Sequence, residues 1–454
     1  MKQKTILFIP LTLALLALAA CNTTPIVPPT AVSEPAAVAT SEPTSEPETE
    51  SETGGFQLAS QYDPTETPTP TATPSATPTT APTETPVPTP TATRPPAIVP
   101  TFTAVEQPAY AASDCSDKYP CNEDAAAWEA RIQVPPGFTA EYFAHIADEQ
   151  PTSLAFGPDG LLYTAVQNGT IFVVDENGDY EPFYEGLIAP TGITWRPGTE
   201  QLYVSSRVVE DNANGEAQIS IIENGRATTL IENLPCCYAF MHGPHTIVFA
   251  SDGMAYVGVG AKSDHGEVLG DGSVQAELTP YEAGIMKFDP DTGAIERFAD
   301  GLRNPYGIAI DSQDQLYATD NGPDYGPPDE FHVIVPGGHH GYPYYGCDVC
   351  FPKPEGLELE PTTFEFPAHS SPTGMTTYFA DQFPGFYDNL FATLWSAFPD
   401  AQRVVHFGPN GVGGTTFATG FAAPIALAVS PEGHLYVADW ATGIIFRIRY
   451  TGEG

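Results

Sequence analysis

One histidine in the sequence stands where it could act as a base. His242 directly precedes an alternating apolar run, in Met-His-Gly-Pro-His-Thr-Ile-Val-Phe. Histidine is the side chain best placed to accept a proton near neutral pH. Further along, Gly-Leu-Arg-Asn-Pro-Tyr-Gly sets the positive charge of Arg303 beside the amide of Asn304. This combination predicts a base and a group that stabilises developing negative charge.

A third stretch could bind a hard cation. Residues 320–330 read Asp-Asn-Gly-Pro-Asp-Tyr-Gly-Pro-Pro-Asp-Glu. Backbone carbonyls exposed at Gly-Pro steps, together with carboxylates, are the oxygen ligands that Ca²⁺ prefers. The same features also have structural explanations, because an isolated histidine is usually structural and Asp-Asn-Gly-Pro is common turn chemistry. The residues alone therefore leave a catalytic site and plain turn chemistry both open.

The composition restricts the kinds of partner. The chain has 454 residues, of which 57 are acidic and 16 basic, and its formal net charge is −41. Nucleic acid binding needs clustered Lys and Arg, so nucleic acid is excluded as a partner, as is electrostatic docking on an anionic membrane. With 41% hydrophobic and 11% aromatic residues, part of the chain must nevertheless bury a core.

The N-terminal end predicts export and a lipid anchor. Lys2 and Lys4 precede an apolar run that ends in Leu-Ala-Ala-Cys at Cys21, and the run is short for a membrane span of about 20 residues. Residues 1–21 resemble the signal peptide and lipobox of bacterial lipoproteins. This resemblance implies lipidation of Cys21, attachment to the membrane through the lipid only, and an extracytoplasmic location. The alternative is an ordinary signal peptide that ends near a cysteine.

Two further segments follow the signal peptide. Residues 22–113 are rich in Thr, Pro and Glu, which predicts a disordered, semi-rigid stalk without chemistry of its own. Residues 114–454 form the folded domain. Its cysteines are even in number, which favours disulfides in an exported chain but leaves their pairing open. They are Cys115, Cys121, Cys236, Cys237, Cys347 and Cys350.

A repeated strand–turn–strand pattern predicts the fold. Each copy has an alternating strand, an Asp-Gly or similar turn, and a second strand with an aromatic anchor. The anchors are Tyr163, Tyr203, Tyr256, Tyr317, Phe391 and Tyr436, the fifth in the weaker copy Phe386–Phe391. Six copies predict an all-β, six-bladed β-propeller with four-stranded blades, and a pair of β-sandwiches is the alternative. Ligands of propellers bind at one mouth of the central channel.

In their order along the chain, these stretches resemble the soluble, quinone-dependent sugar dehydrogenases, which include the glucose/sorbosone dehydrogenases and related pyranose dehydrogenase propellers. The resemblance covers nearly all of residues 135–450 and includes Gly-Ile-Met-Lys-Phe at 284–288 and Leu-Tyr-Val-Ala-Asp at 435–439. It implies a propeller that holds pyrroloquinoline quinone (PQQ) and Ca²⁺ at its mouth. Its small-molecule substrate would be a sugar, oxidised at the anomeric alcohol or at an aldehyde, with an unknown electron acceptor.

The resemblance also implies a role for each matched residue. His242 would remove the substrate hydroxyl proton while hydride passes to the quinone, and Arg303 would stabilise charge on the reduced cofactor. Contacts to the cofactor would come from Asn304 and Asn321, with Arg207 and Trp395 as further candidates. The calcium ligands would be the carbonyls of Gly322 and Pro323, and a second, structural Ca²⁺ would lie at Asp329 and Glu330.

The sequence departs from the family's pattern at the cofactor. Cations that hold the quinone's carboxylates are absent from residues 394–398 and 421–425, so Arg207 is a possible substitute. The family's Asp partner of the catalytic His is replaced by Ala261, with Asp264 three residues on. One Ca²⁺ and Arg303 would still balance the three carboxylates formally.

Other functions and other residues also need to be considered. A surface propeller could keep the fold and Ca²⁺ and bind carbohydrate without redox chemistry, or a propeller lactonase could hydrolyse lactones. Tyr342 and Trp395 could stack on a sugar or simply pack between blades. His339 and His340 are not expected to bind a transition metal, because no spaced Cys, His or carboxylate partner is evident in the sequence.

Overall fold

The computed structural model describes most of the predicted folded domain. The described residues are 114–209, 215–237, 242–264, 278–323, 327–344 and 353–452. The predicted signal peptide with Cys21, the predicted stalk, Cys347 and Cys350 lie outside these ranges, so the predictions for them stay predictions. Among the residues that the structure describes, no helix has the length and apolar character needed to cross a membrane.

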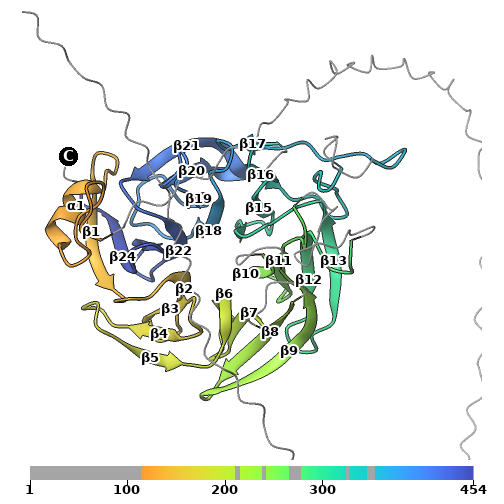
Figure 1. Ribbon diagram of the computed structural model, residues 1–454, viewed down its shortest axis with the longest axis horizontal. Coiled ribbons are helices and arrows are strands. Elements are labelled where there is room, and N and C mark those ends of the chain that lie inside the picture. The colour runs from red at the N-terminus through yellow and green to blue at the C-terminus, as the bar shows by residue number, and fades with distance from the viewer. Residues whose placement is uncertain are drawn as a thin grey trace, which may run out of the picture. The chain divides into compact units, whose positions relative to one another are not determined.

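The strands of the described residues form six antiparallel sheets of four strands each (Figure 1). The first three blades are β2 (Pro151–Phe156), β3 (Leu162–Val166), β4 (Ile171–Val174) and β5 (Tyr180–Tyr184); β6 (Ile188–Trp195), β7 (Leu202–Arg207), β8 (Glu216–Glu223) and β9 (Arg226–Pro235); and β10 (Pro244–Phe249), β11 (Ala255–Val259), β12 (Gly284–Phe288) and β13 (Ile295–Asp300).

In all six blades the strands are given from the centre of the propeller outward, and the last three blades follow here. They are β14 (Ile308–Ile310), β15 (Leu316–Asp320), β16 (Glu330–Val333) and β17 (Phe364–Glu365); β18 (Pro372–Tyr378), β19 (Asn389–Leu394), β20 (Arg403–Gly408) and β21 (Val412–Thr419); and β22 (Pro424–Val429), β23 (Leu435–Asp439), β24 (Ile444–Tyr450) and β1 (Phe138–His145). A short 3₁₀ helix, η1 (Pro409–Gly411), joins β20 to β21.

The predicted six-bladed propeller is confirmed, and the alternative of two sandwiches is wrong. Every aromatic anchor lies in the second strand of its blade. Only the fifth copy differs from its prediction. The segment Phe386–Phe391 does not contain the first strand of the fifth blade. That strand is β18, and residues 379–388 separate it from β19. Phe386 lies in this connection and stacks on Phe391, with ring centroids 6.0 Å apart.

The sixth blade closes the ring with strands from both ends of the folded domain. β1 pairs with β24 from Phe138↔Tyr450 to His145↔Ile444, and Figure 1 shows the two side by side. Before β1, the chain forms the short helix α1 (Ala125–Arg131), which no sequence pattern predicted. Asp124 caps α1 by accepting a hydrogen bond from the Ala127 amide. Closure of this kind joins the two ends of the folded domain in one blade, and the sheet edges that remain are short.

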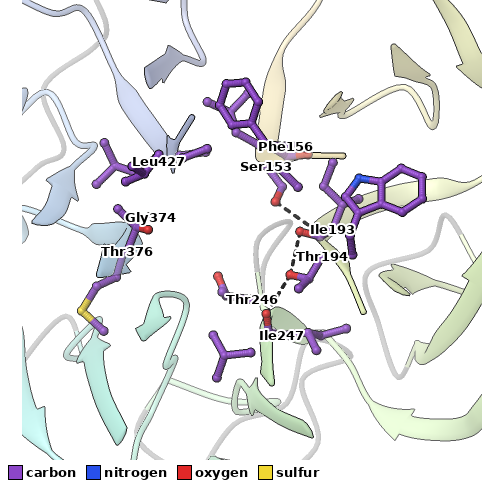
Figure 2. Close-up of a pocket in the computed structure, with 18 of the residues that line it drawn as sticks. Ser153, Phe156, Ile193, Thr194, Thr246, Ile247, Gly374, Thr376 and Leu427 are labelled. Atoms are coloured by element: carbon purple, nitrogen blue, oxygen red, sulfur yellow. Dashed lines mark hydrogen bonds between the residues drawn. The ribbon is translucent and has the colours of Figure 1, made fainter. Parts of the chain in front are cut away.

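The inner strands line a central channel with a cavity of about 340 Å³ (Figure 2). Hydroxyl groups on these strands donate to backbone carbonyls of neighbouring blades. The pairs are Thr152 Oγ1 to Pro190 O, Thr191 Oγ1 to Pro244 O, Thr194 Oγ1 to Ile247 O and Thr377 Oγ1 to Ile310 O, each at 2.7 Å. Adjacent blades are therefore joined by hydrogen bonds as well as by apolar contacts. These bonds also hold the segments that lead into the inner strands in position.

We predict that Phe446→Ala in β24 lowers the free energy of unfolding by about 3–5 kcal/mol, because a buried aromatic ring leaves a cavity when truncated. The Phe446 ring is fully buried and contacts Trp128 of α1, Tyr142 of β1 and Phe421. Phe379→Ala is the matched control, since that ring is 49% exposed and should change stability by only about 0.5 kcal/mol. Denaturant unfolding measures both, and equal losses would contradict the importance of the closing blade.

Candidate active site

Six equivalent positions surround one mouth of the channel. They stand four residues after the aromatic anchors and are Gln167, Arg207, Gly260, Asn321, Trp395 and Trp440. Trp440 donates from Nε1 to Gln167 Oε1 at 3.2 Å, and its ring meets Trp395 edge to face at 5.3 Å. Gln167 and Trp440 were not singled out from the sequence, although the constant spacing after the anchor marks both. Arg207, Asn321 and Trp395, which were predicted, belong to this same ring of positions.

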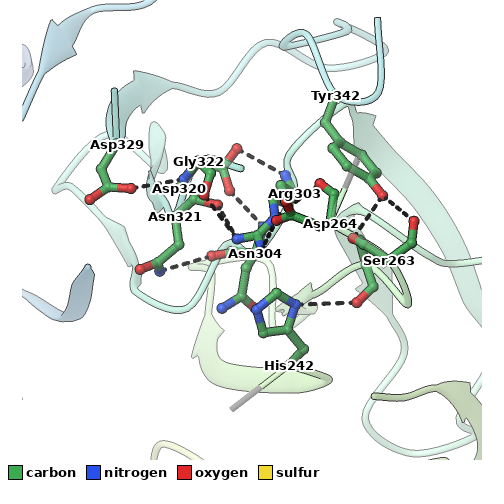
Figure 3. A network of polar contacts seen from close by, with 11 residues as sticks. His242, Ser263, Asp264, Arg303, Asn304, Asp320, Asn321, Gly322, Asp329 and Tyr342 are labelled. Atoms are coloured by element: carbon green, nitrogen blue, oxygen red, sulfur yellow. Dashed lines mark hydrogen bonds and ion pairs between the residues drawn. The ribbon is translucent and has the colours of Figure 1, made fainter. Parts of the chain in front are cut away.

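The segments that enter β10 and β14 bring the remaining predicted residues to this mouth (Figure 3). His242 lies two residues before β10, and Arg303 and Asn304 lie shortly before β14. Backbone hydrogen bonds connect the segments, because Ala261 N donates to Arg303 O at 2.7 Å and Gly260 N donates to Gly243 O at 2.8 Å. The structure therefore places the predicted base close to the predicted charge-stabilising residue.

His242 is suited to accept a proton. Its side chain is nine-tenths buried, and its Nδ1 lies 3.3 Å from the carbonyl oxygen of Ala261. A carbonyl can only accept, so this contact fixes the proton on Nδ1 and leaves the lone pair on Nε2. Burial, with further contributions from the nearby charges of Arg303 and His245, lowers the pKa of His242 well below 6.5. The ring is therefore neutral at neutral pH.

Among the described residues, a backbone carbonyl contacts His242 at the position where the family resemblance implies a carboxylate. The backbone carbonyl of Ala261 orients the ring, and Asp264 instead pairs with Arg303, with Asp264 Oδ1 2.5 Å from Arg303 Nη2. Both side chains of this ion pair are largely buried, with exposed fractions of 6% and 11%. The positive charge of Arg303 is consequently offset inside the site.

Backbone carbonyls hold the rest of the Arg303 guanidinium. Nε donates to Asp264 O at 3.2 Å, and Nη1 donates to Asn321 O and Gly322 O at 3.0 Å each (Figure 3). Arg303 therefore connects the loop after β11 with the loop after β15. The planar guanidinium group makes several hydrogen bonds at once, so it can change position only if these hydrogen bonds break.

Asp320 orders the corner that carries Arg303 and Asn304. One carboxylate oxygen accepts a hydrogen bond from Arg303 N at 2.9 Å, and the other accepts one from Asn304 N at 2.7 Å. Asp320 is fully buried, and this burial raises the pKa of its carboxyl to about 7. With its backbone fixed, Asn304 presents Oδ1 to His245 Nε2 at 2.8 Å. His245 stacks on Tyr306 at 4.2 Å and forms part of the wall.

The predicted calcium ligands Gly322 and Pro323 lie in a tight loop after β15. A Cβ atom at Gly322 would lie 2.7 Å from Pro327 O and 3.1 Å from Pro328 O, so only glycine fits without displacing the backbone. The carbonyl oxygens of Pro327 and Pro328 therefore lie close to Gly322, and carbonyl oxygens are ligands that a hard cation uses. Gly322 O accepts from Arg303 and has a second lone pair for an ion.

Asp329 and Glu330, predicted to share a second Ca²⁺, have different neighbours. The Asp329 carboxylate accepts from Gly322 N at 2.9 Å, Ser371 N at 2.7 Å and Ser370 Oγ at 3.2 Å, and its burial raises its pKa to about 6. Glu330 instead accepts from the hydroxyl of Thr362. The structure therefore uses Asp329 to hold the Gly322 loop, and the second calcium site stays a prediction.

The other predicted contacts are also placed by the fold. Asn321 donates from Nδ2 to Pro372 O at 2.8 Å and to Asn304 O at 3.3 Å. Arg207 is buried, which lowers its pKa, and its charge contributes to a pKa of about 3 for the buried His245. Tyr342 is fully buried with its hydroxyl 2.9 Å from Ser263 Oγ, so it packs between blades rather than against a ligand.

Two cysteine pairs are joined in the structure, Cys115 with Cys121 and Cys236 with Cys237. The second pair lies under the His242 segment. A Cβ atom at Gly243 would lie 3.3 Å from Cys236 Sγ, so the glycine after the histidine allows this close approach. The structure pairs these four cysteines two by two, in the way that the predicted disulfides require, and the Cys236–Cys237 pair lies next to the segment that carries the predicted base.

Comparison with known proteins agrees with this fold. A model of the Glucose / Sorbosone dehydrogenase family matches residues 148–439, more than half of the chain. The chain belongs to the glucose/sorbosone dehydrogenase family. An uncharacterized protein of Borreliella burgdorferi is 28% identical over 280 residues, which cover 57% of this chain and 70% of that protein.

Solved structures of sugar dehydrogenases share the propeller. The apo form of the soluble aldose sugar dehydrogenase from Escherichia coli is 17% identical with a TM-score of 0.57, and the match covers 69% of this chain and 99% of that one. The PQQ-bound form of an aldose sugar dehydrogenase from Streptomyces coelicolor is also 17% identical, with a TM-score of 0.53 and coverage of 70% and 99%. At these identities the likeness establishes the fold.

We predict that Asp264→Asn destabilises the chain by about 3–5 kcal/mol, because it leaves the buried Arg303 charge without its anionic partner. The control is Asp291→Asn, which breaks the pair with Arg196 at the surface, where Asp291 is 70% exposed; this change should have little effect. Thermal and denaturant unfolding measure both variants. If Asp264→Asn unfolds like the parent, the Arg303–Asp264 pair does not stabilise the site.

Proposed function

We propose that this protein is a PQQ- and calcium-dependent sugar dehydrogenase that oxidises the anomeric alcohol, or an aldehyde, of a sugar. The observation that carries the proposal is the buried, neutral His242, whose Nδ1–H is held by Ala261 so that Nε2 can accept a proton. Membership of the glucose/sorbosone dehydrogenase family supports it. The Arg303–Asn304 corner beside this ring supports it further.

The residues at the mouth meet part of what a hard cation and a flat, anionic cofactor require. The carbonyls of Gly322 and Pro323 would hold Ca²⁺, and the carbonyl oxygens of Pro327 and Pro328 close to Gly322 support this. Trp395 and Trp440, both partly exposed, offer aromatic surface at the same mouth. Bound PQQ would supply the acceptor for the hydride that leaves the sugar carbon.

The chain's own contribution is to move a proton and to exclude water. His242 Nε2 would take the proton of the sugar hydroxyl, and the oxidation then leaves a lactone when the substrate is an aldose. Arg303 would stabilise developing negative charge through the part of its own charge that Asp264 does not offset. Asn304, fixed by Asp320 and His245, would orient the bound molecules.

A second function has one specific observation in its favour. The Trp395–Trp440 pair offers aromatic surface at the mouth, and aromatic rings are good platforms for sugar faces. The protein could then be a non-catalytic, carbohydrate-binding propeller. Isothermal titration calorimetry separates the two functions, because saturable binding of PQQ with Ca²⁺ is required by the enzyme and not by the binding module.

We predict that the purified chain, given PQQ and Ca²⁺, reduces an artificial electron-accepting dye in the presence of aldoses. Because a positioned base contributes about 10²–10⁴-fold to proton transfer, His242→Ala should lower kcat/KM by that factor. His434→Ala is the control, since His434 lies in the turn between β22 and β23 and should keep the parent's activity. The proposed dehydrogenase activity would be refuted if no aldose or sugar aldehyde gave turnover, or if the His242→Ala chain were fully active.

We predict an acid limb in the pH profile of kcat/KM that lies below pH 6.5. The pKa of His242 is lowered in the folded chain, so the base is neutral and active above pH 6.5 and becomes protonated, and inactive, only at lower pH. Initial rates measured from about pH 4 to pH 8 locate this limb. His434→Ala should leave it in place, whereas a limb at or above pH 6.5 would show that another group is the base.

A further inference from the structure

Another cavity, of about 370 Å³, lies between the first two blades, which Figure 1 shows next to one another. The turns that reach it join β2 to β3, β6 to β7 and β8 to β9. The candidate active site is formed by segments that precede inner strands and follow second strands, so these turns lie at the opposite end of the blades. The cavity is therefore separate from the site described above.

Three aromatic rings line this cavity. Tyr163 of β3 lies 4.9 Å from Phe183 of β5 and 5.0 Å from Trp195 of β6, measured between ring centroids, and meets both edge to face. Phe183 and Trp195 are half-buried, so part of each ring is open to the cavity. Nε1 of Trp195 is buried and has no hydrogen-bond partner among the described residues, which is rare in folded proteins. The faces of such rings attract cations within about 6 Å.

The same cavity is surrounded by exposed carboxylates. They belong to Asp159, Glu200 and Glu223. The residues that line the cavity include no Lys, Arg or His, and within the described ranges none of the three carboxylates has an ion-pair partner. Arg196, the residue after β6, pairs with Asp291 at 2.6 Å instead. The cavity thus combines aromatic surface with negative charge that the described chain does not balance.

The third blade shows what can occupy such a place. The tyrosine–phenylalanine pair of the first blade recurs there as Tyr256 and Phe298, again with ring centroids 4.9 Å apart. Lys287 is the cross-strand partner of Tyr256, and its Nζ lies 5.7 Å from the centroid of that ring. The same Nζ lies 3.5 Å from Oδ2 of Asp252. An ammonium group of the chain itself is therefore placed between an aromatic ring and a carboxylate.

The first blade keeps the ring and the carboxylate but not the cation. Asp159 stands four residues before Tyr163, the same spacing as in the third blade. The cross-strand partner of Tyr163 is Val173, at the position of Lys287. The sixth blade has Arg447 at this position, with its guanidinium carbon 5.3 Å from an aromatic ring centroid. The first blade therefore has the surroundings for a cation without a cation of its own.

We propose that this cavity binds a small organic cation, with a hydroxyalkyl ammonium such as choline as the representative. The rings would contact the carbon atoms around the charged nitrogen, and the three carboxylates would balance its charge. A hydroxyl on the ligand is an acceptor of the kind that Trp195 Nε1 lacks. An inorganic cation is a poorer match, because it needs several oxygen ligands and the aromatic rings supply none.

This binding site would be independent of the proposed oxidation of sugars. It uses none of the residues at the mouth, and binding is measurable without PQQ, Ca²⁺ or sugar. The two proposals can therefore fail separately. Because the ligand would contact turns of two blades in the folded chain only, it should also raise the thermal midpoint.

The test uses the purified full chain with choline as the probe. Isothermal titration calorimetry at low salt should show saturable binding with a Kd of about 1 mM or lower. Dimethylbutanol, the neutral carbon isostere of choline, should bind at least about 10-fold more weakly because it lacks the charge. Phosphocholine, which represents a lipid headgroup, should also bind more weakly, because its phosphate would lie next to the carboxylates.

The sharpest variant is Val173→Lys, which gives the first blade the cation that the third blade has. The new ammonium group should compete with choline and weaken its binding at least about 10-fold. Val333→Lys is the matched control, because Val333 is the cross-strand partner of the anchor Tyr317 in the fourth blade and is also half-buried. That chain should bind choline like the parent.

A second pair of variants tests the carboxylates. Glu200→Gln/Glu223→Gln should weaken choline binding at least about fivefold, because it removes two of the three negative charges. Glu176→Gln/Glu432→Gln removes two exposed carboxylates from turns that do not line the cavity, so it should leave the affinity unchanged.

Several results would overturn the proposal. These are the absence of saturable choline binding, equal binding of dimethylbutanol, tighter binding of phosphocholine, or unchanged affinity in Val173→Lys. Displacement of choline by an equal concentration of Mg²⁺ would also overturn it, because the carboxylates alone would then explain the binding. Circular dichroism establishes that the variants are folded. If Val173→Lys does not fold, the glutamate double variant carries the test, since both of its residues are exposed.

Discussion

The carboxylate of Asp320 is the interaction on which the candidate site depends. It stands at the end of β15, fully buried, and each of its oxygens accepts one backbone amide of the Arg303–Asn304 corner. That corner leads into the inner strand β14. The hydrogen bonds fix where the Arg303 guanidinium points and where Asn304 meets His245. A buried charge is costly, so a carboxylate can occupy this position only because the blade and the Arg303–Asn304 corner together satisfy its hydrogen-bonding capacity.

The blades could be predicted from the sequence because their signal is local. An aromatic anchor and a tight turn recur in each copy, and both belong to one hairpin whose residues are close in sequence. The fifth copy shows the limit, since the connection 379–388 separates β18 from β19 and hides the first strand. Helix α1 is too short for apolar periodicity, and its role becomes visible only when Trp128 packs on Phe446 of the closing blade.

The site could be predicted only in part. His242, Arg303 and Asn304 directly precede inner strands, so the repeat pattern itself places them at one mouth. The pairing of Asp264 with Arg303 joins two blades, and no spacing along the chain indicates it. The same holds for His340, whose ring lies 4.8 Å from that of His332 on β16. Trp440 is different, because the constant distance from the anchor was sufficient to predict its position.

The charges at the mouth decide how an anionic cofactor would be held in the proposed enzyme. The chain is strongly acidic, and the buried Asp264 offsets the nearest guanidinium. Residues 394–398 and 421–425, where the family's pattern has cations, contain none, and Trp395 and Trp440 in the same two blades offer aromatic surface instead. The attraction for carboxylates must then come from a cation at the Gly322 loop and from Arg207. An ion there would be the centre of cofactor binding, and without it the mouth would repel an anion and favour a neutral sugar.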